Sequence, residues 1–293
     1  MRVEWPTLTL IFVCYGVFGL AVFVLPHVHP ALAILALIPV IALQSSLQHE
    51  VIHGHPFQER RLGEVLVFPS LNLAIPYLRF RDTHLAHHMD ATLTDPYEDP
   101  ESNYLDPARW ARLSSVTRAV LKVNNTLLGR MSIGPAVGQV AFIADDLRLI
   151  RAGDRSVLAG WLWHVPPTLA ILALVWASPL SVWAYLLACY GGLSVLKIRT
   201  FLEHQAHERA RGRTVIIEDR GLLAFLFLNN NLHVVHHMHP KLPWYRLPRI
   251  YFNNREKYLA RNDGYRYASY AQIFRQHFLR AKDPVPHPLY PQK

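Results

Sequence analysis

The stretch PALAILALIPVIALQSSLQHEVIH, residues 30–53, joins an apolar run to a pair of histidines. The run over 30–48 approaches the length of about 20 helical residues that crosses the hydrocarbon core of a bilayer. His49 and His53 are four residues apart, so on a helix they share one face. This stretch therefore predicts a membrane-spanning helix that ends in potential metal ligands.

Three further apolar stretches have a similar length, and 51% of all residues are apolar whereas only 17% are charged. That balance is unusual for a soluble protein. The sequence predicts four membrane-spanning helices in two tight hairpins, at 7–26, 30–48, 157–177 and 179–199. The first stretch is too long for a signal peptide and a second span follows at once, so we expect it to remain in the mature protein.

The basic residues are distributed unevenly, and all but three of the 30 fall in 54–156 and 200–293. The positive-inside rule places these two segments, and with them the predicted site, on the cytoplasmic side of the membrane. The net charge of +9 comes with no compact basic run interleaved with aromatics, so no nucleic-acid partner is expected.

Two shorter apolar segments lie in the predicted cytosolic parts. Residues 62–80 are interrupted by Pro69 and Pro76, and 221–232 is too short to cross, so both are expected to lie along the membrane interface. The Pro-rich end, 284–293, is expected to be frayed. Without repeats or linkers, the sequence predicts a single all-α domain over 1–293.

Three histidine boxes carry the chemistry: His49 and His53; His84, His87 and His88; His233, His236 and His237. The i, i+3, i+4 spacing lets each box point its imidazoles in one direction on a helix. Imidazole nitrogen binds iron, copper, nickel or zinc, whereas calcium and magnesium prefer oxygen. Eight histidines exceed the ligands of one ion, so the pattern predicts two metal ions. A lone histidine would instead be read as an ordinary surface or core residue.

The boxes HEVIH, HLAHH and HVVHH, in this order around two predicted hairpins, resemble the integral-membrane fatty acid desaturase superfamily over 44–248. The resemblance implies four membrane helices, a cytosolic helical cap and a non-haem di-iron centre that uses O₂. The stretches THLAHHMDATLTDPYEDPES (83–102) and NNNLHVVHHMHPKLPWYRLP (229–248) are similar to bacterial members. A bacterial inner membrane is therefore the expected location.

The same resemblance implies one further ligand after the fourth span. The matching stretch offers His204 and His207, and His204 is preferred because it follows the span more closely. His207 would then support the ligands from behind. No catalytic residue beyond the metal ligands is expected.

Metal-bound histidines usually donate their second ring N–H to a carboxylate or another acceptor. For this role, or for placing a water, the sequence offers Glu50, Asp82, Asp90, Asp95, Glu203, His207, Asn229 and Asn230. The asparagines equally suit a helix cap. His55 and His239 point off the box faces. His164 lies in an apolar span, where an ionisable residue is a functional hypothesis by default, but it is too far from the boxes to bind the metal.

The function expected from the resemblance is introduction of a double bond into the fatty acyl chain of a lipid or thioester. The alternative is a hydroxylase or ketolase of a lipid, an alkane or a carotenoid, since the boxes identify the oxidant and not the product. A histidine-rich metal transporter is disfavoured, because transporters place ionisable residues near the midplane. The sequence has no haem domain and no flavin or nicotinamide motif, so electrons are expected from an external ferredoxin or cytochrome.

Overall fold

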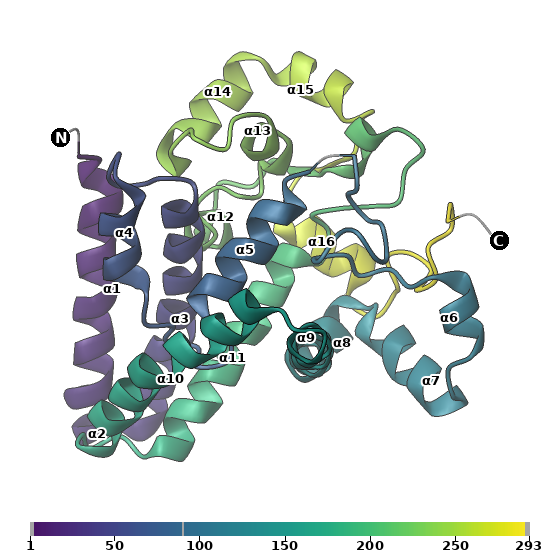
Figure 1. The fold of residues 1–293 in the computed structure, drawn as a ribbon. Coiled ribbons are helices and arrows are strands. Elements are labelled where there is room, and N and C mark those ends of the chain that lie inside the picture. Colours follow the sequence, from purple (N-terminus) through teal and green to yellow (C-terminus); the bar gives the residue numbers. More distant parts are fainter. Residues whose placement is uncertain (1–2, 90, 291–293) are drawn as a thin grey trace. The chain divides into compact units, whose positions relative to one another are not determined.

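The computed structural model describes residues 3–89 and 91–290, and these are mostly helical (Figure 1). The prediction of a helical fold is confirmed, with two two-residue strands as the exceptions in the described part of the chain. The chain divides into two compact units, residues 1–81 with 136–196 and residues 82–135 with 197–293. Each is described by itself, and a single domain over the whole chain remains a prediction.

The first unit contains the long apolar helices. Its elements are α1 (Trp5–Phe23), α2 (Leu25–Val28), α3 (Pro30–Ile52), α4 (Arg60–Val67), most of α9 (Gly134–Arg151), α10 (Arg155–Trp176) and most of α11 (Val182–Thr200). Polar caps begin two of the long helices. His29 Nδ1 accepts a hydrogen bond from the Ala31 amide at the start of α3, and Asp154 caps α10 through the amides of Ser156 and Val157.

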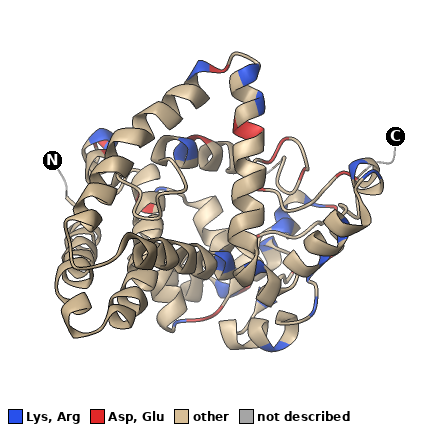
Figure 2. Ribbon diagram, turned by 90° about the horizontal axis from the view of Figure 1, so that it is seen from below, with Lys and Arg blue, Asp and Glu red and all other residues tan. Residues whose placement is uncertain are grey.

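Three helical stretches are long and apolar enough to cross a membrane: Trp5–Val28, Pro30–Ile52 and Arg155–Trp176. Figure 2 shows that charged residues are nearly absent from the long helices beside the N-terminus. The fourth predicted span forms helix α11, which is not among these three. Its Gly191–Gly192 pair and its basic last turn, with Lys197 and Arg199, lower its apolar character. The four-span topology therefore stays a prediction.

The second half of α3 is buried throughout, from Val40 to Ile52, although it includes several polar residues. Two of these polar residues form hydrogen bonds with the end of α4 and the segment that follows it. Gln44 Nε2 donates to the carbonyl oxygens of Val67 and Pro69, at 3.2 and 2.9 Å, and Gln48 Nε2 donates to Val67 O at 2.9 Å. These amides satisfy backbone acceptors of a segment that has no helical partners of its own.

The segment 68–76 continues this pattern. Tyr185 Oη of α11 donates to Leu71 O at 2.7 Å, and His164 Nε2 of α10 donates to Leu73 O at 3.0 Å. Ser70 and Leu71 are buried. Side chains of three helices therefore bond to carbonyl oxygens of this part of the segment. That 62–80 lies along the membrane interface stays a prediction. His164 has a structural role, as a donor to irregular backbone.

Helix α5 (Tyr77–His87) begins in the residues of the first unit and ends in those of the second. The second unit is built from short elements. They are α6 (Pro107–Ala111), α7 (Ser115–Asn124), α8 (Leu127–Ser132), η1 (Ala210–Arg213), β1 (Ile216–Ile217), α12 (Leu222–Leu226), α13 (His233–Met238), η2 (Trp244–Arg246), α14 (Leu247–Asn253), α15 (Arg255–Arg261), β2 (Arg266–Tyr267) and α16 (Tyr270–His277). The strands pair in parallel, Ile216 opposite Arg266. The segment predicted at 221–232 forms only the five-residue α12 before a buried loop.

The core of the second unit fixes the helix that carries the third box. Val234 and Val235, between the histidines of α13, are buried in an apolar cluster. The other members of that cluster are Ile216, Leu232, Leu247, Tyr251 and Tyr258. Because the valines face this core, the three histidines of the box are turned to the other side of the helix.

The C-terminal segment does not fray as predicted in its described part, which ends at residue 290. The Leu105 amide donates to Val285 O, and the His287 amide donates to Leu105 O at 2.8 Å. Val285 and His287 are buried, and Thr94 Oγ1 lies 3.2 Å from His287 Nε2. Backbone pairing with the 94–105 loop therefore anchors residues 285–287.

Candidate metal centre

Four histidines of the second unit converge on one point. His87 ends α5, His204 follows α11, and His233 and His237 lie on α13. One ring nitrogen of each lies within 4.8 Å of the others. His204 Nε2 is 2.9 Å from His87 Nε2 and 3.1 Å from His233 Nε2. We refer to these residues as the four-histidine group.

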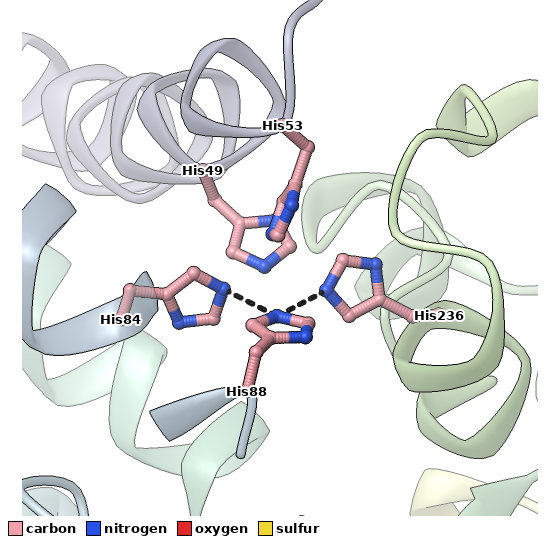
Figure 3. A group of neighbouring side chains, drawn as sticks. All are labelled: His49, His53, His84, His88 and His236. Carbon is pink, nitrogen blue, oxygen red and sulfur yellow. Dashed lines mark hydrogen bonds between the residues drawn. The ribbon is translucent and has the colours of Figure 1, made fainter. Parts of the chain in front are cut away.

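Three more histidines of this unit converge in the same way, and we refer to them as the three-histidine group. His88 Nε2 lies 3.0 Å from His84 Nε2 and 3.2 Å from His236 Nε2. Figure 3 shows the three rings with these nitrogen atoms turned toward one another. The second and third boxes therefore each contribute to both groups, because neighbouring histidines on one helix point in different directions.

The first box belongs to the other unit. His49 and His53 lie one turn apart near the C-terminal end of α3, with ring centroids separated by 4.9 Å, and both side chains are drawn in Figure 3. His49 is 2% exposed, so α3 carries a buried imidazole at the end of an apolar helix.

The nitrogen spacing fits metal coordination. Ligand nitrogens that each lie about 2.0–2.1 Å from one ion at angles between octahedral and tetrahedral are roughly 2.9 to 3.4 Å apart. The four measured Nε2–Nε2 distances, from 2.9 to 3.2 Å, fall in this range. Imidazoles whose nitrogens point at one another without an ion would place several donors or lone pairs in conflict, so the donor set suits two transition-metal ions.

The outward ring nitrogens have acceptors behind them. His87 Nδ1 lies 2.8 Å from Asp99 Oδ1, and His84 Nδ1 lies 3.1 Å from Glu101 Oε1. His233 Nδ1 is 3.1 Å from Asn230 Oδ1. When an Nδ1–H donates to such an oxygen, the Nε2 lone pair is left for a metal and its basicity rises.

Asn230 is itself held in place by a charged pair. Its Nδ2 donates to Glu203 Oε1 at 2.9 Å, and Arg199 Nε lies 3.2 Å from the same carboxylate oxygen. Arg199 and Glu203 are both buried. This chain of contacts fixes the amide orientation, so that Asn230 presents its oxygen to His233.

Burial lowers the pKa of His204 and of His233 well below the usual range, and the neighbouring imidazoles lower it further. Both rings are therefore neutral, which is the form that binds metals. Burial also opposes charge on His87, but Glu101 and Asp99 outweigh it and raise the pKa of His87 to about 9. These two carboxylates make the surroundings of His87 favourable for positive charge.

The structure gives the other residues predicted at the site different surroundings. His204, and not His207, joins the four-histidine group; His207 Nδ1 instead accepts from the Arg209 amide. Asn229 donates to Trp244 O, and Asp95 accepts from the amides of Tyr97 and Glu98 in a turn.

The remaining sequence candidates have other surroundings. Glu50 is buried in α3, Asp82 is half-buried in α5, and Asp90 lies outside the described residues. His55 Nδ1 pairs with Glu4 Oε2 at 2.8 Å. His239 Nε2 lies 3.2 Å from Tyr258 Oη.

Sequence reasoning missed Asp99 and Glu101. Both lie in the stretch that follows the second box, and the intervening turn folds them back onto His87 and His84. The available signal was an acidic, Pro-containing turn directly after a box, since such a turn can return carboxylates to the preceding helix. Asp99 is also fixed locally, because its Oδ2 accepts from the Thr94 amide and its Oδ1 from the Glu101 amide.

Comparison with known proteins identifies the family of the chain. The chain matches the family model described as "Fatty acid desaturase" over residues 23–269. It is also 26% identical over 234 residues to a protein named "Beta-carotene ketolase" from Paracoccus sp. (strain PC1), a match that covers 75% of this chain and 80% of that relative. Since the family model spans most of the sequence, the chain belongs to the fatty acid desaturase family.

Proposed function

We propose that this protein is an O₂-dependent di-iron oxidoreductase of the membrane, with its site on the cytoplasmic side, that oxidises a C–H bond of a long apolar substrate. The observation that carries the proposal is the pair of convergent histidine groups, whose outward nitrogens face Asp99, Glu101 and Asn230. Family membership supports the same reading, because members use iron held by box histidines.

In this proposal the four-histidine group holds one iron ion and the three-histidine group holds the other. His49 and His53 complete the second set of ligands, a step that rests on the sequence pattern of the three boxes. When bound, iron would supply the oxidising power that removes hydrogen from an unactivated methylene, which no side-chain acid or base can do.

The chain's own residues orient and shield the site. Asp99 and Asn230 fix the ring planes of His87 and His233, so that their lone pairs point inward before any ion binds. The buried imidazoles of His84, His87, His233 and His236 limit the access of water to the site. Such preorganisation keeps the coordination geometry constant while the charge at the centre changes.

The first candidate reaction is desaturation of a fatty acyl chain of a lipid or thioester. Removal of two hydrogens with O₂ takes two further electrons and two protons and releases two waters. The second candidate is hydroxylation or ketolation, which places one oxygen atom of O₂ in the product. The ketolase relative favours this second candidate, and its match extends over most of both chains.

Lipid profiling separates the two reactions. Membranes of a host that expresses the chain are compared with those of a host expressing the inactive variant His87→Ala, by mass spectrometry. A product lighter by two hydrogens, with a new double bond, supports desaturation, whereas a gain of one oxygen supports hydroxylation and an oxo group in place of two hydrogens supports ketolation. Identical profiles under aerobic growth, with the substrate classes supplied, would contradict the proposal.

Both reactions need an external electron donor, for which we propose an acidic ferredoxin or cytochrome. A small solvent-open pocket reaches the four-histidine group at His237, and its other lining residues include Arg211 and Arg261. Arg209 and Arg211 lie exposed beside it, with Asp263 as their carboxylate neighbour. Cations around a pocket that reaches a proposed ligand suit an acidic partner.

Salt dependence tests this donor. Turnover with a purified acidic carrier is expected to fall as ionic strength rises, because screening weakens the encounter of the two surfaces. Reduction of the iron by dithionite, a small reductant, serves as the control that requires no docking. Carrier-driven turnover that is indifferent to salt would count against the basic docking surface and leave the histidine site unaffected.

A further inference from the structure

Helix α7 (Ser115–Asn124) is unusual because none of its ten residues is buried. Its start is well defined, since Ser114 Oγ accepts a hydrogen bond from the Thr117 amide at 3.1 Å. An isolated helix shorter than roughly 12 residues is marginal in water, and most helices in proteins are stabilised by packing of an apolar face. An apolar face of α7 would therefore be stabilised by burial against something other than the core of this chain.

The face in question is a stripe of valines. Val116, Val120 and Val123 are 72%, 40% and 53% exposed and lie at i, i+4 and i+7, which places them on one side of the helix. Ala119, also exposed, falls within the same stripe. Leu121 and Arg118, on the other side, are half-buried. The helix therefore rests on the protein by one side and presents an aliphatic surface on the other.

The charged residues in the sequence around the stripe have one sign. Between Asp106 and Asp145 the sequence contains no acidic residue, while it contains Arg109, Arg112, Arg118, Lys122 and Arg130. Arg112, just before α7, and Lys122, in its last turn, are exposed. An aliphatic stripe flanked by cations is the pattern of helices that lie in the interface of an anionic bilayer.

We propose that α7 is an interfacial helix, with its valine stripe in the headgroup boundary of the bilayer and its cations on anionic lipid headgroups. A bilayer is favoured over a protein partner for two reasons. The chain has three helices long and apolar enough to cross a membrane, so the protein that carries α7 is expected at a bilayer. Protein interfaces are also enriched in aromatic residues and Met, which the stripe lacks.

Depth-dependent quenching tests this directly. Full-length protein is reconstituted in vesicles of phosphatidylcholine and phosphatidylglycerol, and an environment-sensitive fluorophore is attached at Val120→Cys. The matched control is Thr117→Cys, an exposed position of the same helix outside the stripe. The natural cysteines Cys14 and Cys189 are buried, and labelled unsubstituted protein measures their background.

Lipids brominated near the top of the acyl chain should remove most of the fluorescence at position 120 and little of it at 117. Charge reversal by Arg112→Glu with Lys122→Glu should reduce quenching at 120 in anionic vesicles, but not in purely zwitterionic ones. Equal quenching at 120 and 117, in variants that retain their iron, would overturn the proposal. Shielding of position 120 only after a soluble protein is added would overturn it too, in favour of a protein interface.

Discussion

The two histidine groups of the second unit present their nitrogens at nearly the same spacing, but they are supported differently. Behind the four-histidine group stand Asp99, with a side chain 2% exposed, and the buried Arg199–Glu203–Asn230 chain. Behind the three-histidine group stands Glu101, whose side chain is 26% exposed. The difference shows that the residues behind the four-histidine group are buried within one unit, whereas the carboxylate behind the three-histidine group is partly open to solvent.

The largest expected effect tests whether both groups are needed. His87→Ala in the four-histidine group and His236→Ala in the three-histidine group should each abolish turnover and lower bound iron, because each removes an inward nitrogen. His239→Ala, next to the third box but hydrogen-bonded to Tyr258, is the control and should stay active. Full activity of either ligand variant would refute the assignment of its group. Turnover and iron content of the purified proteins are the measurements.

The next effect compares the two supporting carboxylates. Asp99→Asn should weaken metal binding by about 10- to 100-fold, since it replaces a buried carboxylate that accepts from a ligand imidazole. Glu101→Gln should weaken it less, because this side chain is only half-buried and water can partly replace the lost carboxylate. Titration of the metal-free protein with Fe(II), followed in each variant, checks the order. Equal losses would mean that burial does not distinguish the two supports.

A smaller effect is expected at the charged chain behind His233. Glu203→Gln keeps the shape and one acceptor for Asn230 but leaves the buried Arg199 without its countercharge. We expect the free energy of unfolding to fall by about 1–3 kcal/mol, with less iron retained on heating. Thermal unfolding in detergent, with iron measured in parallel, is the assay. If iron were lost at an unchanged unfolding temperature, Glu203 would act on the metal alone.

The smallest effect serves as the reference outside the histidine groups. Glu218 accepts from Tyr251 Oη and Arg255 Nε and also pairs with Arg266. Burial raises the pKa of Glu218, but these donors outweigh it and lower the pKa from 4.5 to about 2. Its stabilisation is therefore present above pH about 4.5 and is lost as the pH falls toward about 2.

Glu218→Gln should consequently lower the unfolding temperature modestly at neutral pH and leave iron content unchanged. The difference between variant and parent should shrink as the pH is lowered below about 4.5. A loss of iron in Glu218→Gln at neutral pH would show that general loosening, and not the support of particular imidazoles, explains the effects at Asp99 and Glu203.

Much of this comparison could be predicted from the sequence. Helical spacing was enough to expect that each box points its imidazoles together, and the position of His204 after α11 favoured it over His207. The sequence did not predict that the histidines of one box would be divided between two groups. His87 and His88 are adjacent in sequence, and only the backbone direction of the last turn of α5 sends them to different partners.

The other features that the sequence did not predict lie in loops, where the spacing of residues does not indicate which side chains will meet. Asp99 reaches His87 because the 94–102 turn folds back, while Asp95, equally acidic, is used by the turn itself. The packing of the 68–76 segment was not expected, since a sequence does not reveal that Gln44 and His164 donate to its carbonyls. Polar residues inside apolar helices were the signal, and they indicated irregular backbone as well as function.

Metal analysis of the purified protein tests the central claim most directly. Protein produced in iron-supplemented medium is measured by mass spectrometry of the metals and by Mössbauer spectroscopy after enrichment with ⁵⁷Fe. The account predicts two iron ions per chain, and loss of iron in His87→Ala and in His236→Ala. One zinc ion per chain with no iron would contradict it and would favour a metal-binding or transport role for the histidines.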